Sequence, residues 1–272
     1  MNKTKFMLNV LGTAVFILSS AFIAEGQNNR TFVSGTGSDG NTGTGCQQNA
    51  PCRTFASAIG VTNAGGQVIA LDSTGYSAFS INKSITIEGA PGQTAFIFVG
   101  AGGTGVTVTG AASDLIILRN LFIDGLNVGT NIGLQHNSGK LVVENCTFRS
   151  LTTGVSVFHA RMDLVNSTLY SNTTAVSSDG AGASTPGNGS TVSVAMIRIN
   201  GGNITNNGTG LLQKNPGIDP TNSTFLANIW VFTLTPTPSV GNLNVIANTA
   251  NTACSGATNC IFPLYRMGDN FQ

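Results

Sequence analysis

Charged residues are what this sequence has least of. Asp, Glu, Lys and Arg make up 8% of its 272 residues, whereas ordinary globular proteins contain about 25%. Nucleic acids and acidic membrane surfaces are bound through clusters of Lys and Arg, and the sequence has no such cluster, so we expect neither partner. The surface must instead be covered by Ser, Thr, Asn and Gly, a composition that suits sugar contacts and is equally typical of β-turn-rich proteins.

The signatures of common enzyme sites are also missing. No two acidic residues are adjacent, and no nucleotide-binding loop, zinc motif or serine nucleophile elbow occurs. We therefore expect no metal ion and no cofactor, and we favour a protein that is not an enzyme.

Long apolar runs are absent apart from one, Phe6 to Ala21, which follows Lys3 and Lys5. A basic start, an apolar centre and small residues at the end are typical of a secretory signal, and the run is short for a bilayer span. We predict a signal peptide over residues 1–26, a secreted or cell-surface protein, and no membrane span after removal of the signal. A retained N-terminal anchor is the alternative.

Five cysteines are present, and four of them form two pairs with the same spacing. Cys46 and Cys52 are six residues apart, as are Cys254 and Cys260. In an exported chain this spacing predicts two local disulfides, one at each end. Metal binding is less favoured because neither pair has a His or a further Cys nearby. Cys146 is interpreted as a small packing residue, with a reactive thiol as the alternative.

The dominant positive feature is a module that recurs about every 21 residues. Each copy alternates apolar and polar positions, reaches an Asn or Gly, and ends on an apolar residue three positions later. Four segments fit without gaps, namely 116–123, 141–148, 162–169 and 197–204. A period near 20 residues built from two-residue alternation is typical of a stacked β-solenoid.

A second, shorter segment follows three of these modules. It starts at Val155, Val176 and Leu211, each time after Gly or Ala, and Val106 and Leu134 fit the same slot. In such coils the apolar residues are expected to point inward and to stack on their equivalents, about 4.8 Å above and below.

One slot of the module holds Asn120, Asn145 and Asn166, with Gly89 and Gly201 in the equivalent positions. A turn with left-handed backbone suits Asn and Gly. We also predict that the Asn side chains hydrogen-bond along their column, as in the ladders of cross-β structures.

One helix is expected, from about Thr54 to Thr62. Thr54 suits its N-cap, and Phe55, Ala58 and Ile59 fall on one face at helical spacing. A stack of coils has an open end that must be covered, and a short amphipathic helix before the first coil does so.

The chain is accordingly divided into four parts. Residues 1–26 form the signal peptide, 27–66 the N-terminal strand, disulfide loop and capping helix, 67–241 the coils, and 242–272 a C-terminal cap, because the repeat is lost there. A polar, Gly-rich insertion at 177–191 is expected to form a loop.

These features, in this order, carry a resemblance. The segments Arg30–Ser34, Pro51–Phe55, Gly65–Leu71 and Ile85–Gly89, followed by the Asn-bearing coils, resemble the pectin-lyase-like superfamily over roughly residues 30–234. Their order is typical of secreted bacterial members. The resemblance implies an all-β fold, a right-handed single-stranded parallel β-helix with a short N-terminal capping helix. It says little about function.

Enzymes of similar fold need acidic clusters. The polygalacturonase-like branch uses Asn-Thr-Asp, Asp-Asp and Gly-His-Gly motifs, and none occurs here. The pectate-lyase-like branch uses calcium held by several acids, with an Arg or Lys as base. In this chain three outward acids each face a cation on the neighbouring coil: Arg119 with Glu144, Asp124 with Arg149, and Asp163 with Arg198. We interpret these as surface ion pairs rather than as a metal site.

One cluster of polar residues is the strongest candidate for a functional site. His159, Arg161 and Asp163 alternate with inward residues, so they should face outward together, with Lys140 beside Arg161 and Arg198 beside Asp163. Such a face suits an acidic sugar or the base of a lyase. The alternative, which we favour, is a solvated charged surface.

Four further residues were considered for a site. His136 shares a slot with residues that suggest a turn or surface position. Tyr76, Tyr170 and Trp230 are candidates for stacking on sugars, although Trp230 is better interpreted as packing under the C-terminal cap.

The sequence leaves two main functions open. The favoured hypothesis is a secreted, non-catalytic β-helix that binds carbohydrate or serves as an extracellular structural module. The alternative is a polysaccharide lyase acting on acidic polysaccharide through Arg161, Lys140 or His159, with calcium as its one conceivable cofactor. A surface adhesin is less favoured, since no anchoring segment follows.

Overall fold

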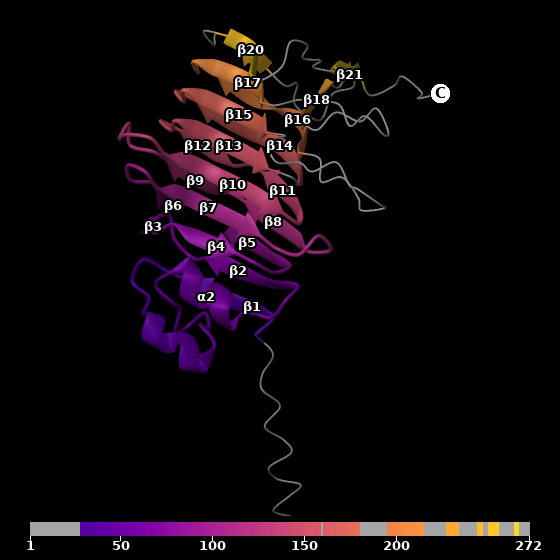
Figure 1. Ribbon diagram of the computed structural model, residues 1–272. Helices are drawn as coiled ribbons and strands as arrows, with labels where there is room; N and C mark the ends of the chain where they lie inside the picture. The colour runs from indigo at the N-terminus through magenta and orange to yellow at the C-terminus, as the bar shows by residue number, and fades with distance from the viewer. Residues whose placement is uncertain are drawn as a thin grey trace, which may run out of the picture.

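The computed structural model of the chain describes residues 28–158, 160–179 and 195–214, together with four later strands (Figure 1). The predicted signal peptide at 1–26 lies outside the described residues. Within the described part of the chain, no helix is long and apolar enough to cross a membrane.

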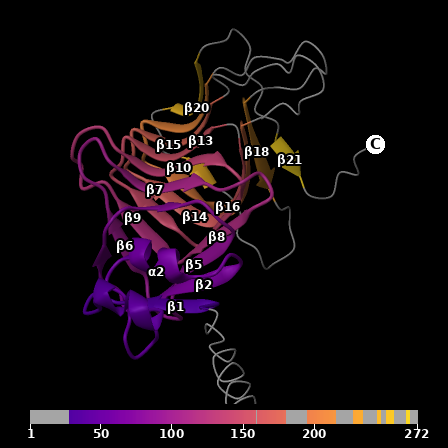
Figure 2. The same cartoon turned by 60° about the horizontal axis from the view of Figure 1, so that its bottom comes forward.

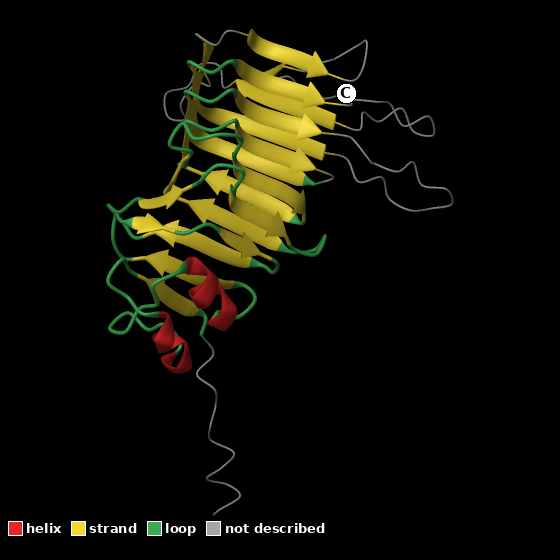
Figure 3. Cartoon of the chain, turned by 60° about the vertical axis from the view of Figure 1, so that its left-hand side comes forward, coloured by secondary structure: helices red, strands yellow, loops and turns green. Residues whose placement is uncertain are grey.

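The strands form two hydrogen-bonded parallel sheets, and the larger one turns a corner through β14 and β16 (Figures 1 and 3). Its two faces are termed here the first and second sheets and the smaller sheet the third, and together they surround one core. The first sheet contains β1 (Arg30–Val33), β2 (Gly66–Ala70), β5 (Ile85–Gly89), β8 (Leu115–Arg119), β11 (Lys140–Glu144), β14 (Arg161–Tyr170), β16 (Ala195–Thr205), β18 (Ala227–Thr233) and β21 (Leu264–Arg266). The second contains β3 (Gly75–Tyr76), β6 (Ala95–Phe98), β9 (Leu121–Asp124), β12 (Thr147–Arg149), the second halves of β14 and β16, and β19 (Asn244–Ile246). The third contains β4 (Phe79–Ile81), β7 (Thr104–Thr109), β10 (Ile132–Ser138), β13 (Thr153–Phe158), β15 (Thr174–Asp179), β17 (Thr209–Lys214) and β20 (Ala250–Ser255).

Each pairing between these strands is parallel, and consecutive coils pair in order along the stack. Strands β14 and β16 run around the corner between the first and second sheets and so join them. Figure 2 shows β1 and α2 at one end of the stack and β20 at the other. The chain is therefore an all-β parallel β-helix, which confirms the predicted fold.

The predicted inward columns are confirmed by the register. Ile116, Leu141, Met162 and Ile197 are neighbours on successive coils, and each exposes at most 2% of its surface. Their neighbours along each strand point outward. Strict two-residue alternation explains why the sequence alone locates this core.

The corner after the first sheet is also as predicted in most coils. Asn120, Asn145 and Asn166 have φ values of 55°, 52° and 45°, and Gly201 has 70°. Gly89 differs, since its φ is outside the left-handed region. A Cβ atom there would lie 2.5 Å from the carbonyl oxygen of Gln93, so close approach of the backbone requires this glycine.

The predicted hydrogen-bonded ladder of these corner Asn side chains is not present in the described residues. A ladder forms instead from buried Asn residues before the third sheet. The Asn172 side chain accepts from Leu151 N at 3.0 Å, donates to Phe148 O at 3.1 Å and donates to Asn207 Oδ1 at 3.0 Å. Asn131 occupies the corresponding place earlier in the stack, donating to Gly125 O at 3.0 Å. Burial makes this ladder the one that matters for stability, because it satisfies backbone groups that water cannot reach.

The Gly or Ala before each third-sheet segment has a steric cause. A Cβ atom on Gly133 would lie 2.6 Å from Gly154 O, and one on Gly154 would lie 2.6 Å from Ala175 O. The backbone of each coil therefore approaches the next so closely that large side chains are excluded from this column.

The N-terminal end is covered by helix α2 (Phe55–Val61), as predicted. Thr54 caps it by accepting from Ser57 N at 3.3 Å. The Phe55 ring lies 4.8 Å from the Tyr76 ring and 4.7 Å from the Phe79 ring, so the helix closes the core with aromatic contacts. The loop before α2 contains a short 3-10 helix, η1 (Asp39–Thr44), and the disulfide between Cys46 and Cys52 is confirmed.

Two predictions for the C-terminal half need correction. Ser177 to Asp179 belong to β15 rather than to the inserted loop, whose other residues lie outside the described part of the chain. The repeat also continues beyond residue 242, since β19, β20 and β21 pair in parallel with β16, β17 and β18. Long insertions between these strands hide the period in the sequence. Cys254 lies in β20, and Cys260 lies outside the described residues, so that disulfide stays a prediction.

Candidate functional site

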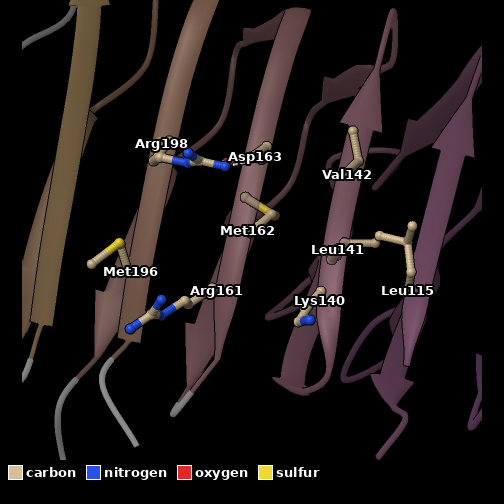
Figure 4. A pocket seen from close by; sticks show the side chains of 9 residues that line it. All are labelled: Leu115, Lys140, Leu141, Val142, Arg161, Met162, Asp163, Met196 and Arg198. Carbon is tan, nitrogen blue, oxygen red and sulfur yellow. Dashed lines mark hydrogen bonds and ion pairs between the residues drawn. The ribbon is translucent and has the colours of Figure 1, made fainter. Parts of the chain in front are cut away.

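A hollow of about 310 Å³ lies on the outer surface of the first sheet, across strands β8, β11, β14 and β16 (Figure 4). Its lining residues are Leu115, Lys140, Leu141, Val142, Arg161, Met162, Asp163, Met196 and Arg198. Four of the five residues that the sequence singled out are therefore brought together. The fifth, His159, lies outside the described residues.

Two columns of side chains build this surface. Lys140 stands beside Arg161 in register, and Asp163 stands beside Arg198, as the repeat predicts. Inward neighbours such as Leu141 and Met162 are buried in the core and hold the strands in place. The outward positions of the charged residues thus follow directly from the two-residue alternation.

Asp163 and Arg198 form a bidentate ion pair. Both Nε and Nη2 of Arg198 donate to the two carboxylate oxygens of Asp163, and Figure 4 shows the two side chains pointing toward each other. This hydrogen-bonded contact raises the pKa of the Arg198 guanidinium above its usual value. The acid of the site is therefore already occupied by one cation.

Lys140 and Arg161 differ from the other charged neighbours. Both are exposed, and within the described residues neither takes part in an ion pair. Among in-register charged pairs of the described strands, theirs is the one with like charges. Like charges on directly opposite positions destabilise a sheet. In a chain with so few charges, this arrangement concentrates positive potential at one place.

Apolar groups surround the two cations. Leu115 is in register with Lys140 and exposes 46% of its surface, and Met196 is in register with Arg161. Val142 is in register with Asp163, so it lies in the neighbouring column beside the two cations (Figure 4). The hollow therefore offers two cationic donors with aliphatic surface on both sides.

Trp230 stands next to this site in the sheet. It is the register partner of Arg198 on β18, in the column that also contains Asp163. This pairing places Trp230 in a regular strand, and its packing under the C-terminal cap stays a prediction because its side chain lies outside the described part of the chain. The long insertion before β18 prevented the sequence from showing this register.

His136 was expected at a turn or on the surface, and this is wrong. It is completely buried on β10, in an inward column with Val108 and Val157. Its Nε2 lies 3.2 Å from the carbonyl oxygen of Arg161, and its Nδ1 has no hydrogen-bond partner. Burial lowers the pKa of His136 to about 4, so the ring is neutral at physiological pH. The predicted column of His136, Val157, Ser178 and Gln213 is confirmed by the register, but its polar members are buried rather than exposed.

The three expected charge pairs are all present, but one of them is not a surface pair. Arg119 binds Glu144 at 2.5 Å. Arg149 donates to Asp124 through Nε at 3.1 Å and also through Nη2, and the Asp124 side chain exposes only 3% of its surface. Asp124 is therefore a buried anchor for Arg149 rather than a solvated acid.

Neither metal ligands nor a reactive thiol emerges from the described residues. No group of three or more His, Cys, Asp or Glu in that part of the chain is placed to hold a metal ion. Cys146 is buried, and burial raises the pKa of its thiol to about 12. A thiol with that pKa is not ionised at neutral pH, which agrees with its interpretation as a packing residue.

Comparison with known proteins gave two similar structures. No family model and no curated protein matches the chain. A pectate lyase, Pel9A, is similar over 89% of this chain and 72% of its own, with 12% identity and a TM-score of 0.47. A rhamnogalacturonan lyase is similar over 88% of this chain and 63% of its own, with 14% identity and a TM-score of 0.47. The fold assignment rests on the strand pairings of the chain itself.

Proposed function

We propose that this chain is an exported carbohydrate-binding module that holds an acidic polysaccharide at Lys140 and Arg161. The observation that carries the proposal is the like-charge pair itself, exposed and in register on β11 and β14. An anion between the two cations converts their mutual repulsion into attraction. The predicted signal peptide supports a location where such polymers occur.

The chemistry of the pair suits a carboxylate or a sulfate ester. The Arg161 guanidinium presents two parallel N–H donors to such a group, and the Lys140 ammonium adds a compact charge. Leu115 and Met196 offer aliphatic contacts to the apolar faces of the sugar rings on either side. Arg198 does not extend the pair of free cations, because Asp163 neutralises it.

Affinity is expected to be modest and to depend on salt. A charge-assisted hydrogen bond contributes about 1.5–3 kcal/mol, and exposed charges are screened over about 8 Å at physiological ionic strength. Removal of Arg161 should therefore weaken binding by roughly 10-fold or more.

One alternative function shares the same residues. Two adjacent cations also suit a lyase, in which one neutralises the uronate carboxylate and the other takes the proton beside it. Calcium would belong to this alternative. Arg161 or Lys140 would act as the base, because Arg198 is engaged by Asp163.

Calorimetric titration with oligogalacturonate and with sulfated oligosaccharide tests the proposal. We expect binding by the wild type, weaker binding by Arg161→Ala and tighter binding by Asp163→Asn, which releases Arg198. Arg30→Ala is the matched control, since it removes one exposed cation from β1, far along the same sheet. Equal affinities in all four proteins, or no binding, would contradict the proposal.

The same samples distinguish binding from catalysis. They are incubated with polysaccharide in the presence of calcium and in the presence of a chelator, and unsaturated ends are followed by ultraviolet absorbance. Absorbance that rises with the wild type and not with Arg161→Ala would establish the lyase alternative in place of a binding module.

A further inference from the structure

A row of flat side chains lies on the outer surface of the second sheet, away from Lys140 and Arg161. The ring centroids of Phe98 and Phe96 are 6.4 Å apart, those of Phe96 and Phe122 are 5.2 Å apart, and the Arg149 guanidinium lies 5.1 Å from the Phe122 centroid. Together these four groups form what we term the aromatic row.

The register explains why the row is continuous. Phe96 on β6 is in register with Phe122 on β9, so their rings are in contact on neighbouring coils, tilted by 42°. On the preceding coil the same position is Gly75. A Cβ atom there would lie 2.7 Å from the ring of Phe98, so the absence of a side chain at Gly75 leaves the place that Phe98 fills. The Phe98 ring is nearly parallel to that of Phe96, at 16°.

Arg149 closes the row as a fixed and neutralised group. It is bound by buried Asp124, and it also contacts Tyr170, which is its register partner on β14. Its charge is therefore balanced within the protein, and the row as a whole is electrically neutral. The row is partly open to solvent, since Phe98 exposes 46% of its surface and the Arg149 side chain 41%.

We propose that the aromatic row binds a neutral oligosaccharide that lies along the axis of the stack. Its groups succeed one another at 5.1 to 6.4 Å, which is about the length of one equatorially linked pyranose residue. Phe96 and Phe122 are one coil apart, by about 4.8 Å, and Phe98, on the same strand as Phe96, extends the row by lying over Gly75 of the preceding coil. The apolar faces of successive sugars then stack on successive rings. This site is separate from the proposed anion site and does not depend on it.

The area of the row favours a sugar over a protein partner. A Phe side chain buries about 150–250 Å² when it is fully covered, and the three rings of the row are already more than half buried. The surface area that these rings still expose is far below the roughly 800 Å² that each partner contributes to a stable protein interface. A chain of pyranose rings needs no more than this surface.

Titration of the full chain with cellohexaose, and with mannohexaose as a second neutral probe, tests the inference. We expect Phe98→Ala and Phe122→Ala each to weaken binding about 3- to 10-fold, while Phe98→Tyr retains it. Val128→Ala is the matched control, because Val128 is another exposed apolar residue, at 41%, outside the row. The double variant Lys140→Ala, Arg161→Ala should bind these neutral probes normally, which separates this site from the anion site.

The inference is wrong if neither probe binds at millimolar concentration, or if Phe98→Ala and Phe98→Tyr bind as tightly as the wild type. It is also wrong if the wild type is a dimer in light scattering that Phe98→Ala converts to a monomer, because the row would then be an interface between copies of this chain.

Discussion

The Nε2 atom of His136 lies 3.2 Å from the carbonyl oxygen of Arg161. A side chain from the interior of the third sheet therefore contacts the backbone of the strand that carries the candidate site. Because a carbonyl oxygen only accepts, Nε2 carries the proton, and Nδ1 is left as a buried acceptor without a partner. The protonation of one buried ring is thereby connected to the position of Arg161.

Acid should destabilise the protein through this residue. The folded-state pKa of His136 is about 4, below its ordinary value of 6.5. The unfolded chain therefore takes up the proton first, and stability falls as the pH drops from about 6.5 to about 4. The total loss should be about 3 kcal/mol, since one pKa unit corresponds to about 1.4 kcal/mol.

Urea unfolding at pH 7.5 and at pH 4.5 measures this effect. His136→Gln is the control, because Gln has no titrating ring and the same column holds Gln213. The variant should lose less stability on acidification than the wild type. An identical pH dependence in both proteins would show that other groups dominate.

The two kinds of Asn column should respond very differently to mutation. Asn172→Ala removes three hydrogen bonds from the core and leaves Leu151 N and Phe148 O buried without these partners. We expect a loss of about 3 kcal/mol, because each unsatisfied buried group costs about 1–3 kcal/mol. Asn145→Gly should change stability by less than about 0.5 kcal/mol, because Gly also tolerates φ of 52° on an exposed corner. Equal losses in chemical denaturation would contradict this assignment.

Trp230 should report on the anion site. It is the single tryptophan of the chain, and it pairs in register with Arg198, next to the hollow. Binding of oligogalacturonate should therefore change its fluorescence with the same midpoint as the heat of binding. Neutral oligosaccharide at the aromatic row, on another sheet, should leave the emission unchanged. A response to the neutral probe alone would place Trp230 elsewhere.

The fold and the candidate site could be predicted from the sequence only where the repeat is regular. Between Ile116 and Ile204 the alternation fixes both face and register, so the positions of Lys140 beside Arg161 and Asp163 beside Arg198 follow from the sequence. Trp230 could not be placed in the same way, because a long insertion precedes its strand. Where the period is interrupted, register depends on pairing that the local sequence does not encode.

Polar residues inside the stack were the other source of error. His136 and Asn172 look like surface residues by composition, and only bonds to distant backbone groups make their burial favourable. The aromatic row was missed for a related reason. Phe96, Phe98 and Phe122 resemble core residues. Their outward position emerges once the register is known, in which Gly75, Phe96 and Phe122 share one column.

The central claim is that Lys140 and Arg161 are placed side by side for an anion at a cost in stability. Lys140→Glu tests it most directly, because it recreates beside Arg161 the pairing that Glu144 already makes with Arg119. Thermal unfolding and oligogalacturonate titration are measured on the same samples. We predict a gain of about 1 kcal/mol in stability together with the loss of binding. Unchanged binding of oligogalacturonate by the stabilised variant would contradict the account.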